Sequence, residues 1–389
     1  GLSDIIARVA TGLPVEYKEP TEEMILVPIY ESMLEKASLL TLLKPKWDFE
    51  FFQTSPKRQT DILGVIRLSG GSSVDLLGEI EVSDLFFNGK FGNNINLNFK
   101  FGDYLGLDLG TLTYYGIRNR FGILTNIGYN ESPFFLYENR RKKAKFINRE
   151  AYLNIGVFNQ PSNNSMISYG ILSKLSSLKQ DTGGSLSQNL EYSENQAKTY
   201  LRFKYDNLDS ISNPMRGIKA EFIYNFASSF GKSKSNSYGP AYSIKGYVPI
   251  NSKSSFVYGL NLASLRGDRI RADQRIRLGG MYTNIDNNEF EFYGLNYQEK
   301  QVKDLISLTL GFKHKIVYSL YFNTKFNIAT FTEDNPLNNN DSRLWKNYSK
   351  GLGISISYDS PIGPIEFSVS SDLKHKRPIG SISIGYKLD

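Results

Sequence analysis

The sequence predicts an all-β fold: a sixteen-stranded antiparallel transmembrane β-barrel that follows a short, partly helical N-terminal segment. Three observations support this prediction. Apolar and polar residues alternate through most of the chain, no apolar run is long enough for a transmembrane helix, and short and long connections between strands alternate. The 25 Tyr and 25 Phe add the aromatic content that strands favour.

The alternation has a period of two residues, as do side chains on the two faces of a strand. Within residues 351–359, for example, Leu352 and Ile354 alternate with Gly353 and Ser355. The same pattern occurs at 94–101, 304–313, 317–329 and 379–388. Soluble β-sandwiches also alternate, with their apolar face in a shared core, so this pattern alone leaves both architectures open.

Connection lengths distinguish these two architectures. We expect strands at 60–69, 75–88, 94–102, 106–116, 121–130, 145–158, 166–178, 197–207, 216–228, 238–249, 254–266, 304–315, 317–330, 350–359, 363–372 and 379–388. Connections after even-numbered strands are short, and most of those after odd-numbered strands are long. Short turns at one rim and long loops at the other are typical of bacterial outer-membrane barrels, with the short turns in the periplasm. We therefore predict an outer-membrane barrel over residues 60–389.

Residues 1–59 do not follow the alternating pattern. The stretch from Tyr30 to Leu43 has the spacing of an amphipathic helix, and Trp47 to Gln53 fits one further strand. Because this segment precedes the first barrel strand, we expect it on the periplasmic side or in the lumen, as a linker, a plug or the remnant of a periplasmic domain. No signal peptide is visible at Gly1, so we expect a mature form or a fragment of a longer chain.

The composition argues against several kinds of site. The chain has no Cys, which excludes disulfides, thiolate metal sites and cysteine nucleophiles. His314 and His375 are its only histidines, so we expect no multi-histidine metal site and no cofactor. The net charge is +7, but Lys and Arg are dispersed among Asp and Glu except for one basic cluster from Arg140 to Lys145. No nucleic-acid-binding motif accompanies that cluster, and we expect no nucleic-acid partner.

Three local patterns are candidates for functional segments. The first is a short turn in 205–217, where two aspartates resemble calcium ligands but equally cap a tight turn, with Pro and Gly setting its backbone. The second is a rigid turn in 359–367. Their residues are Asp206, Asp209, Pro214, Arg216 and Gly217 in the first, and Ser360, Pro361, Gly363 and Pro364 in the second.

The third pattern is the connection from Gly267 to Lys303, which is too long to be a simple connector. Its charges suit either an exposed extracellular flap or a loop folded into a polar lumen. Its aromatic residues favour the lumen, because an apolar ring gains free energy when a wall covers it. The candidate lumenal residues are Arg266, Arg269, Arg271, Arg275, Arg277, Gly279, Gly280, Phe292, Tyr293 and Gly294.

Together, these patterns resemble the BamA-type outer-membrane translocator superfamily, also called the bacterial surface-antigen barrel. That family has sixteen strands, a D…D…P…G turn before the ninth strand, an S-P-x-G-P turn near the C-terminus, and a sixth extracellular loop that begins with Gly-Gly and enters the lumen. Here the corresponding residues begin at Asp206, Ser360 and Gly279, in the same order along the chain. The resemblance covers about residues 60–389 and implies a translocator.

The chain also departs from the family. The family's loop carries Arg-Gly-aromatic, whose Arg docks on the inner wall, whereas this loop has only Tyr293-Gly294. Loss of that Arg resembles the patatin-like autotransporters, whose barrel secretes an N-terminal lipase; no G-x-S-x-G motif occurs here, so such a lipase would lie upstream. The C-terminal residue is Asp389 rather than an aromatic. The residues expected to form the C-terminal assembly signal are Ile382, Ile384, Tyr386 and Leu388.

The leading hypothesis is a translocator, not an enzyme, that exports an attached N-terminal passenger or assembles outer-membrane proteins. A passive porin is the alternative, and an outer-membrane phospholipase is a third hypothesis, with His314 or His375 as its base. The expected partners are the lipid bilayer and lipopolysaccharide, the barrel assembly machinery, and the passenger or client proteins.

Overall fold

The computed structural model describes residues 57–70, 74–88, 91–115, 120–138, 140–183, 190–230, 235–271, 274–281, 283–333, 347–360, 363–374 and 378–385. The wall strands are β1 (Lys57–Gly70), β2 (Val74–Asn88), β3 (Phe91–Gly102), β4 (Leu105–Tyr115), β5 (Phe121–Glu138), β6 (Arg141–Ser162), β7 (Ser165–Gly183), β8 (Tyr192–Asp206), β9 (Gly217–Phe230), β10 (Asn236–Asn251), β11 (Ser254–Ser264), β14 (Lys300–Val317), β15 (Leu320–Glu333), β16 (Asn347–Ser360), β17 (Gly363–Asp372) and β18 (Pro378–Gly385). The connection between β11 and β14 contains β12 (Ile276–Leu278), the 3-10 helix η3 (Ile285–Asn287) and β13 (Glu289–Phe290).

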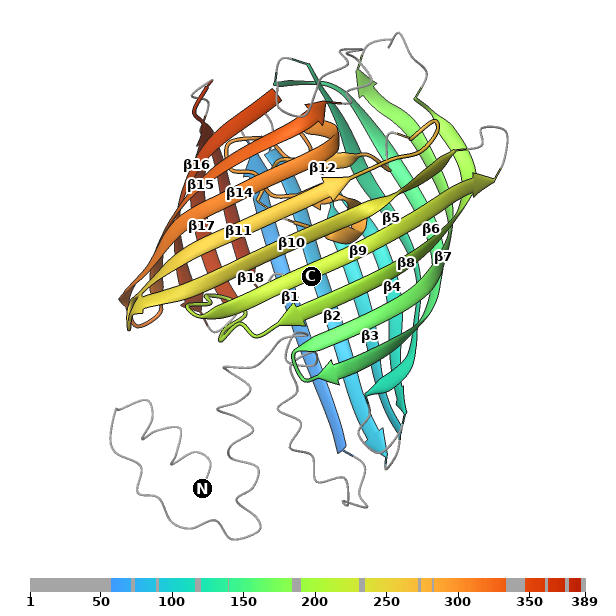
Figure 1. The fold of residues 1–389 in the computed structure, drawn as a ribbon, viewed down its shortest axis with the longest axis horizontal. Coiled ribbons are helices and arrows are strands. Elements are labelled where there is room, and N and C mark those ends of the chain that lie inside the picture. The colour runs from blue at the N-terminus through green and yellow to red at the C-terminus, as the bar shows by residue number, and fades with distance from the viewer. Residues whose placement is uncertain are drawn as a thin grey trace. The chain divides into compact units, whose positions relative to one another are not determined.

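The wall is a closed antiparallel barrel. Neighbouring wall strands pair antiparallel in chain order, β11 pairs directly with β14, and β18 pairs with β1 (Figure 1). The sheet contains eighteen strands, and setting aside the two short strands β12 and β13 leaves sixteen in the wall. The predicted sixteen-stranded antiparallel barrel is therefore confirmed. No helix among the described residues has the length and apolarity needed to span a membrane.

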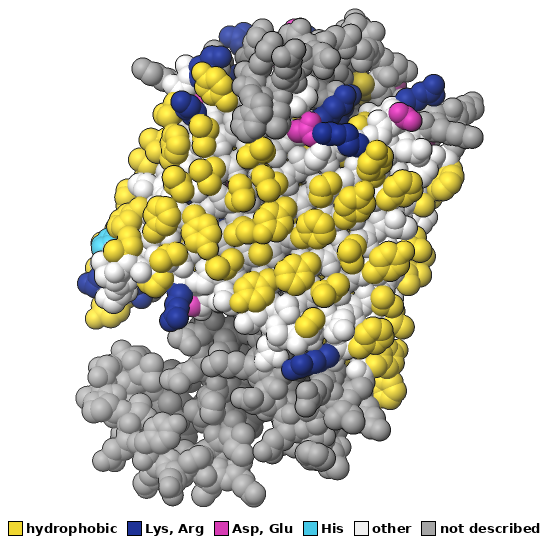
Figure 2. Space-filling view, in the orientation of Figure 1, with side chains coloured by type: hydrophobic (Ala, Val, Ile, Leu, Met, Phe, Trp, Pro, Cys, Tyr) yellow, Lys and Arg dark blue, Asp and Glu magenta, His cyan; other side chains and the backbone are white. Residues whose placement is uncertain are grey.

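The two faces of the wall differ in the way that the alternation predicts. On β16, Leu352, Ile354 and Ile356 point outward and are 41–46% exposed, whereas Ser355 and Ser357 are buried on the lumenal face. On the face that Figure 2 draws, a broad band of hydrophobic side chains crosses the middle of the wall, with charged side chains near its two ends. An exposed apolar band is unfavourable in water and favourable in a bilayer, where closure also pairs the backbone groups of the strands.

One predicted loop is largely strand. We expected a connection over 131–144, but β5 continues to Glu138 and β6 begins at Arg141, so the two strands form a long hairpin. Its four consecutive residues Phe134, Phe135, Leu136 and Tyr137 are all buried. A strand covered on both faces has no polar side to alternate with, which is why periodicity did not reveal it.

Two predicted segments fall partly outside the described residues. The helix expected at 30–43 and the strand expected at 47–53 lie outside them, and of the segment 1–59 only residues 57–59 are described, as part of β1. At the C-terminus, Ile382 and Ile384 lie on the outer face of β18, whereas Tyr386 and Leu388 fall outside the described residues.

Candidate functional site

The candidate site is the lumen, which contains a cavity of about 680 Å³. Inward side chains of the wall and the connection between β11 and β14 line it. That connection together with the first four residues of β14, residues 265–303, is called the lumenal loop below. It reaches wall residues around the barrel, from Tyr104 beside β4 through β8 and β15 to β17.

Backbone pairing gives the lumenal loop a defined fold. Its strand β12 pairs antiparallel with the start of β14, through Ile276 with Val302, and parallel with β13. Gly279 and Gly280 have φ values of 132° and 81°, which favour glycine, and they reverse the chain after β12. The Gly280 amide then donates to the Leu295 carbonyl at 3.0 Å, and the Phe292 amide donates to the Gly280 carbonyl at 2.9 Å.

An apolar cluster attaches the lumenal loop to the wall. The side chains of Leu278, Phe290 and Phe292 are fully buried in one cluster with Ile223 of β9 and Phe331 of β15. Burial of such rings contributes about 1.5–3 kcal/mol for each side chain. The loop is thus packed like a small core inside the barrel.

Tyr293 lies against the inner face of β16. Its ring packs against Gly353 of β16, and its carbonyl lies against Gly351. Lys325 of β15 donates to its hydroxyl, with the ammonium 4.9 Å from the ring centroid. The next residue, Gly294, has a φ of 91° and lies against the backbone of β17. The loop lacks the family's Arg, but it still contacts the inner wall, through the phenol of Tyr293 and the ammonium group of Lys325.

The five candidate arginines of the loop do not share one environment. Arg271 is buried, 3.5 Å from Glu194 of β8 and stacked over Tyr192, whereas Arg277 pairs with Glu289 within the loop at 3.4 Å. Arg266 pairs with Asp304 at the start of β14 but is half exposed, Arg269 is exposed, and Arg275 is half-buried. Arg271 thus forms a buried ion pair to a wall strand.

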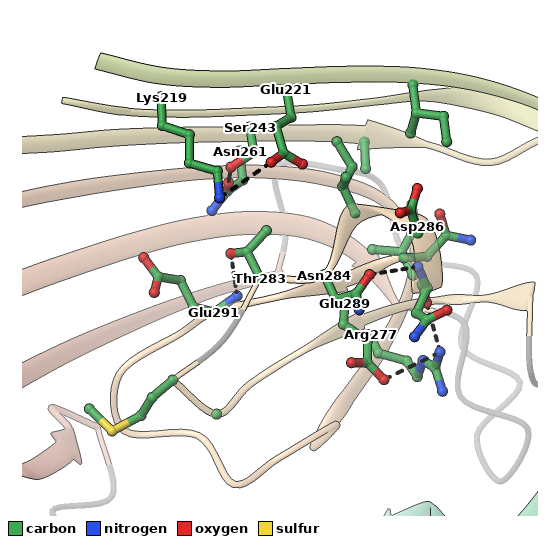
Figure 3. Close-up of a pocket in the computed structure, with 18 of the residues that line it drawn as sticks. Lys219, Glu221, Ser243, Asn261, Arg277, Thr283, Asn284, Asp286, Glu289 and Glu291 are labelled. Carbon is green, nitrogen blue, oxygen red and sulfur yellow. Dashed lines mark hydrogen bonds and ion pairs between the residues drawn. The ribbon is translucent and has the colours of Figure 1, made fainter. Parts of the chain in front are cut away.

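The loop also presents two carboxylates to the wall. Asp286, in η3, forms an ion pair with Arg202 of β8, and its carbonyl accepts a hydrogen bond of 3.4 Å from Lys198. Glu291 interacts electrostatically with Lys245 of β10 and Lys325 of β15. Figure 3 shows both loop carboxylates in the cavity.

Sequence reasoning missed Arg140, at the tip of the β5–β6 hairpin. Its guanidinium forms ion pairs of 2.9 Å with Glu299 of the loop and with Asp372 of β17, and it donates to the Gly294 carbonyl. Both carboxylates are almost fully buried. The hairpin therefore extends over the loop to the far wall. The only signal in the sequence was the basic cluster from Arg140, which also suited a solvated surface.

Further polar contacts hold the hairpin to the loop. The Phe135 amide donates to the side chain of Gln298 at 3.4 Å, and the side chain of Gln301 donates to the Phe135 carbonyl at 3.3 Å. Tyr137 donates to the Tyr297 carbonyl. Burial, followed by the field of Glu289, raises the pKa of Tyr297, so its phenol stays protonated and donates to Glu289 at 2.6 Å.

At the opposite rim, the β8–β9 turn crosses toward β16. Asp209 accepts hydrogen bonds from the amides of Met215 and Arg216, and Gly217 has a φ of 107°. Asn213, which sequence reasoning also missed, is buried and donates to Ser357 at 3.1 Å and to Asp359. The lumen is therefore narrowed at its short-turn end as well as at its centre.

The remaining turn residues have local contacts. Asp206 is buried and accepts from the Leu208 amide at 3.0 Å, Pro214 is buried, and Arg216 is exposed. In the second turn, Ser360 donates to the Gly363 carbonyl at 2.6 Å, Gly363 has a φ of 106°, and Pro364 pairs with Asp359. Pro361 falls outside the described residues.

The Omp85 superfamily domain matches residues 87–380. The chain belongs to the Omp85 superfamily. Solved structures agree on the fold of this Omp85 barrel. BamA from Haemophilus ducreyi lacking POTRA domains 1–3 is 16% identical, with a TM-score of 0.61 over 85% of this chain and 71% of that one. CdiB from Acinetobacter baumannii is 10% identical, with a TM-score of 0.54 over 85% of this chain and 65% of that one.

CdiB from Escherichia coli is similar at 10% identity and a TM-score of 0.50, over 84% of this chain and 63% of that one. This Omp85 chain thus spans less than two thirds of either CdiB chain. Among curated proteins, none matches it. Membership and fold place the chain in the bacterial outer membrane, as a barrel of the translocator and assembly class.

His314, the described histidine of this Omp85 barrel, lies on β14 beside a serine. Its Nδ1 is 2.9 Å from the Oγ of Ser254, its cross-strand partner on β11, and its ring stacks on Phe312. In the described part of the chain, no carboxylate bonds to this histidine. The register of β11 with β14 is enough to explain why the His314 and Ser254 side chains are in contact. His375 falls outside the described residues.

Proposed function

We propose that this Omp85 barrel is a translocator for a polypeptide passenger attached to its N-terminal side, as in the patatin-like autotransporters. The observation that carries the proposal is a polar lumen closed by a loop that only noncovalent contacts hold. Such a loop seals the membrane at rest and leaves when a chain must pass. The barrel itself carries no catalytic step in this proposal, and any lipase activity would belong to the passenger.

Strand order supports the route of the passenger. As an odd-numbered wall strand, β1 ends at the long-loop rim and begins at the short-turn rim. The short-turn rim is periplasmic in barrels of this kind. A passenger joined before β1 therefore starts in the periplasm. Its way out is through the lumen, past the lumenal loop and the β5–β6 hairpin.

Assembly of other outer-membrane proteins is the second candidate, and the β1–β18 seam favours it. Among the described residues, six pairs join β1 to β18, whereas fourteen join β1 to β2. Val65 pairs with Gly385, the last described residue of β18. If this seam parts, its two edge strands become templates for pairing with another chain, so a client strand has a place to add.

Surface exposure of a fused passenger tests the proposal. A small folded reporter is joined before Gly1, and protease is added to intact cells. We expect the reporter to be digested from outside while the barrel stays intact. A control with Lys253→Gln should keep export, because this exposed residue of the β10–β11 turn does not line the cavity. A reporter that remains protected in wild-type cells, with a correctly inserted barrel, would rule out export.

Conductance distinguishes a translocator from a passive porin. We expect the purified chain to conduct little in planar bilayers, with brief openings. Removal of residues 281–297 should give a large, steady conductance, because those residues fill the lumen. A wild-type chain that conducts steadily at the level of the deletion variant would identify a porin instead.

A further inference from the structure

The inner wall carries four cations that face the lumenal loop. Lys198 and Arg202 lie on β8, Lys245 on β10 and Lys325 on β15, and all four line the cavity. We call these four residues the basic wall. Nearby Lys219 already pairs with Glu221 on its own strand, at 3.4 Å. Among the described residues that line the cavity, β8, β9, β10 and β15 contribute only two carboxylates, Asp206 and Glu221.

The loop and the wall share the counter-charges of the basic wall. Glu150 of β6 interacts with Lys198, Glu221 of β9 with Arg202 and Glu366 of β17 with Lys325, and the loop adds two carboxylates. Asp286 pairs with Arg202 and accepts from Lys198 through its carbonyl, and Glu291 interacts with Lys245 and Lys325. We call Asp286 and Glu291 the acidic tip. Glu289 is not part of it, because it bonds within the loop to Arg277, Tyr297 and Gln298. Figure 3 shows the acidic tip in the cavity, with Lys219 and Glu221 on the wall.

Departure of the loop would take both carboxylates away from the basic wall. Cations in a narrow lumen are less well hydrated than cations at a free surface, so loss of their partners has a free-energy cost. A polypeptide that brings its own carboxylates offsets this cost. The wall therefore discriminates between segments that enter the lumen by their charge.

We infer that the basic wall is a binding site for an acidic segment of the transported polypeptide, which the acidic tip occupies in the closed state. The inference rests on the proposed translocation, and it adds the chemistry of the substrate. The ligand is a stretch of chain with several Asp or Glu residues. Neutral and basic segments lack the charge to displace the tip.

Two variants with opposite expected effects test the inference. The full chain in detergent is titrated with a fluorescent peptide of Gly, Ser and Glu, and with the same peptide carrying Gln in place of Glu. Asp286→Asn with Glu291→Gln weakens the tip, and we expect the acidic peptide to bind roughly tenfold more tightly. Arg202→Gln with Lys245→Gln weakens the wall, and we expect roughly tenfold weaker binding.

Controls separate binding from folding and from general charge. Lys253→Gln removes an exposed cation at the β10–β11 turn and should leave binding unchanged. Migration of each variant before and after heating shows whether its barrel has folded, and misfolding cannot produce tighter binding in one pair and weaker binding in the other. Added salt should weaken binding of the acidic peptide. Equal affinity for both peptides, or no change in the tip variant, would overturn the inference.

The result is independent of the export experiment. If the fused reporter reaches the surface but the acidic peptide shows no preference, the proposed function stands and the acidic-segment site is wrong. If the reporter never reaches the surface, the proposed function fails whatever the peptide does.

Discussion

Two glycines on β16 make room for the residue that anchors the lumenal loop. A Cβ at Gly351 would collide with the carbonyl of Tyr293, and one at Gly353 would collide with its ring. The backbone of the loop therefore approaches the wall more closely than any larger residue allows. Lys325 adds a charge-assisted bond from the neighbouring strand.

Gly351→Ala should release the loop from the wall. Because the colliding atoms belong to the loop backbone, a rotamer change cannot relieve the clash. We expect higher conductance and easier protease cleavage of the loop, with the barrel still folded. Gly380→Ala is the matched control, since a Cβ there meets nothing within 4 Å. If both variants conduct like the wild type, the anchor at β16 is not what holds the loop.

Arg140 is the second residue on which closure depends. Arg140→Ala leaves Glu299 and Asp372 buried without their guanidinium, which typically costs about 3–5 kcal/mol. We expect faster hydrogen exchange at residues 134–137 and a lower unfolding temperature. Lys143→Ala removes an exposed pair with Glu138 and should change stability by less than about 1 kcal/mol. Equal effects from the two substitutions would show that the buried ion pairs of Arg140 do not stabilise the closed hairpin.

At the scale of the element, each strand contacts two solvents. Its outward residues meet lipid, and its inward residues meet the polar lumen, so neighbouring positions tolerate opposite chemistry. The middle of β5 is an example, with Ile127 more than half exposed outside and Asn126 at the cavity inside.

Ile127→Arg should destabilise the barrel by about 2–4 kcal/mol if it meets the bilayer midplane, because lipid does not solvate the guanidinium. Asn126→Arg should cost much less, since the added charge faces the wet lumen. Unfolding by denaturant in lipid vesicles measures both. Similar losses at the two positions would show that the assigned faces are wrong.

At the scale of the molecule, the parity of the connections orients the barrel. The connection after β7 belongs to the long-loop rim and the one after β10 to the short-turn rim. The first should face the outside of the cell and the second the periplasm. Both rims have exposed positions for labels, Thr182 and Lys253.

Thr182→Cys should react with an impermeant maleimide on intact cells, whereas Lys253→Cys should react only after the outer membrane is opened. The chain has no cysteine of its own, so each label reports one site. Labelling of Lys253→Cys in intact cells would show that the assigned orientation of the barrel is the wrong way round.

Periodicity in the sequence determined the strands, their faces and their number. Each of these depends on residues two apart in the chain, and the alternation at Leu352 and Ile354 needed no knowledge of the neighbouring strands. The parity of long and short connections then indicated the membrane. Prediction failed locally where that period ends, as in the hairpin from Phe134 to Tyr137, which is buried on both faces.

Only the tertiary structure decided how the lumen is closed. Arg140 meets Glu299 across 159 residues of chain and Asp372 across 232, and Asn213 meets Asp359 across 146. No local pattern records such pairs, because barrel closure alone brings their strands to facing sides of one lumen. The sequence showed Tyr293 in place of an Arg, but its site between Gly353 and Lys325 depends on the register of β15 with β16. Complementary charge and shape across the lumen exist only in the closed barrel. The sequence pattern of a single strand therefore cannot predict them.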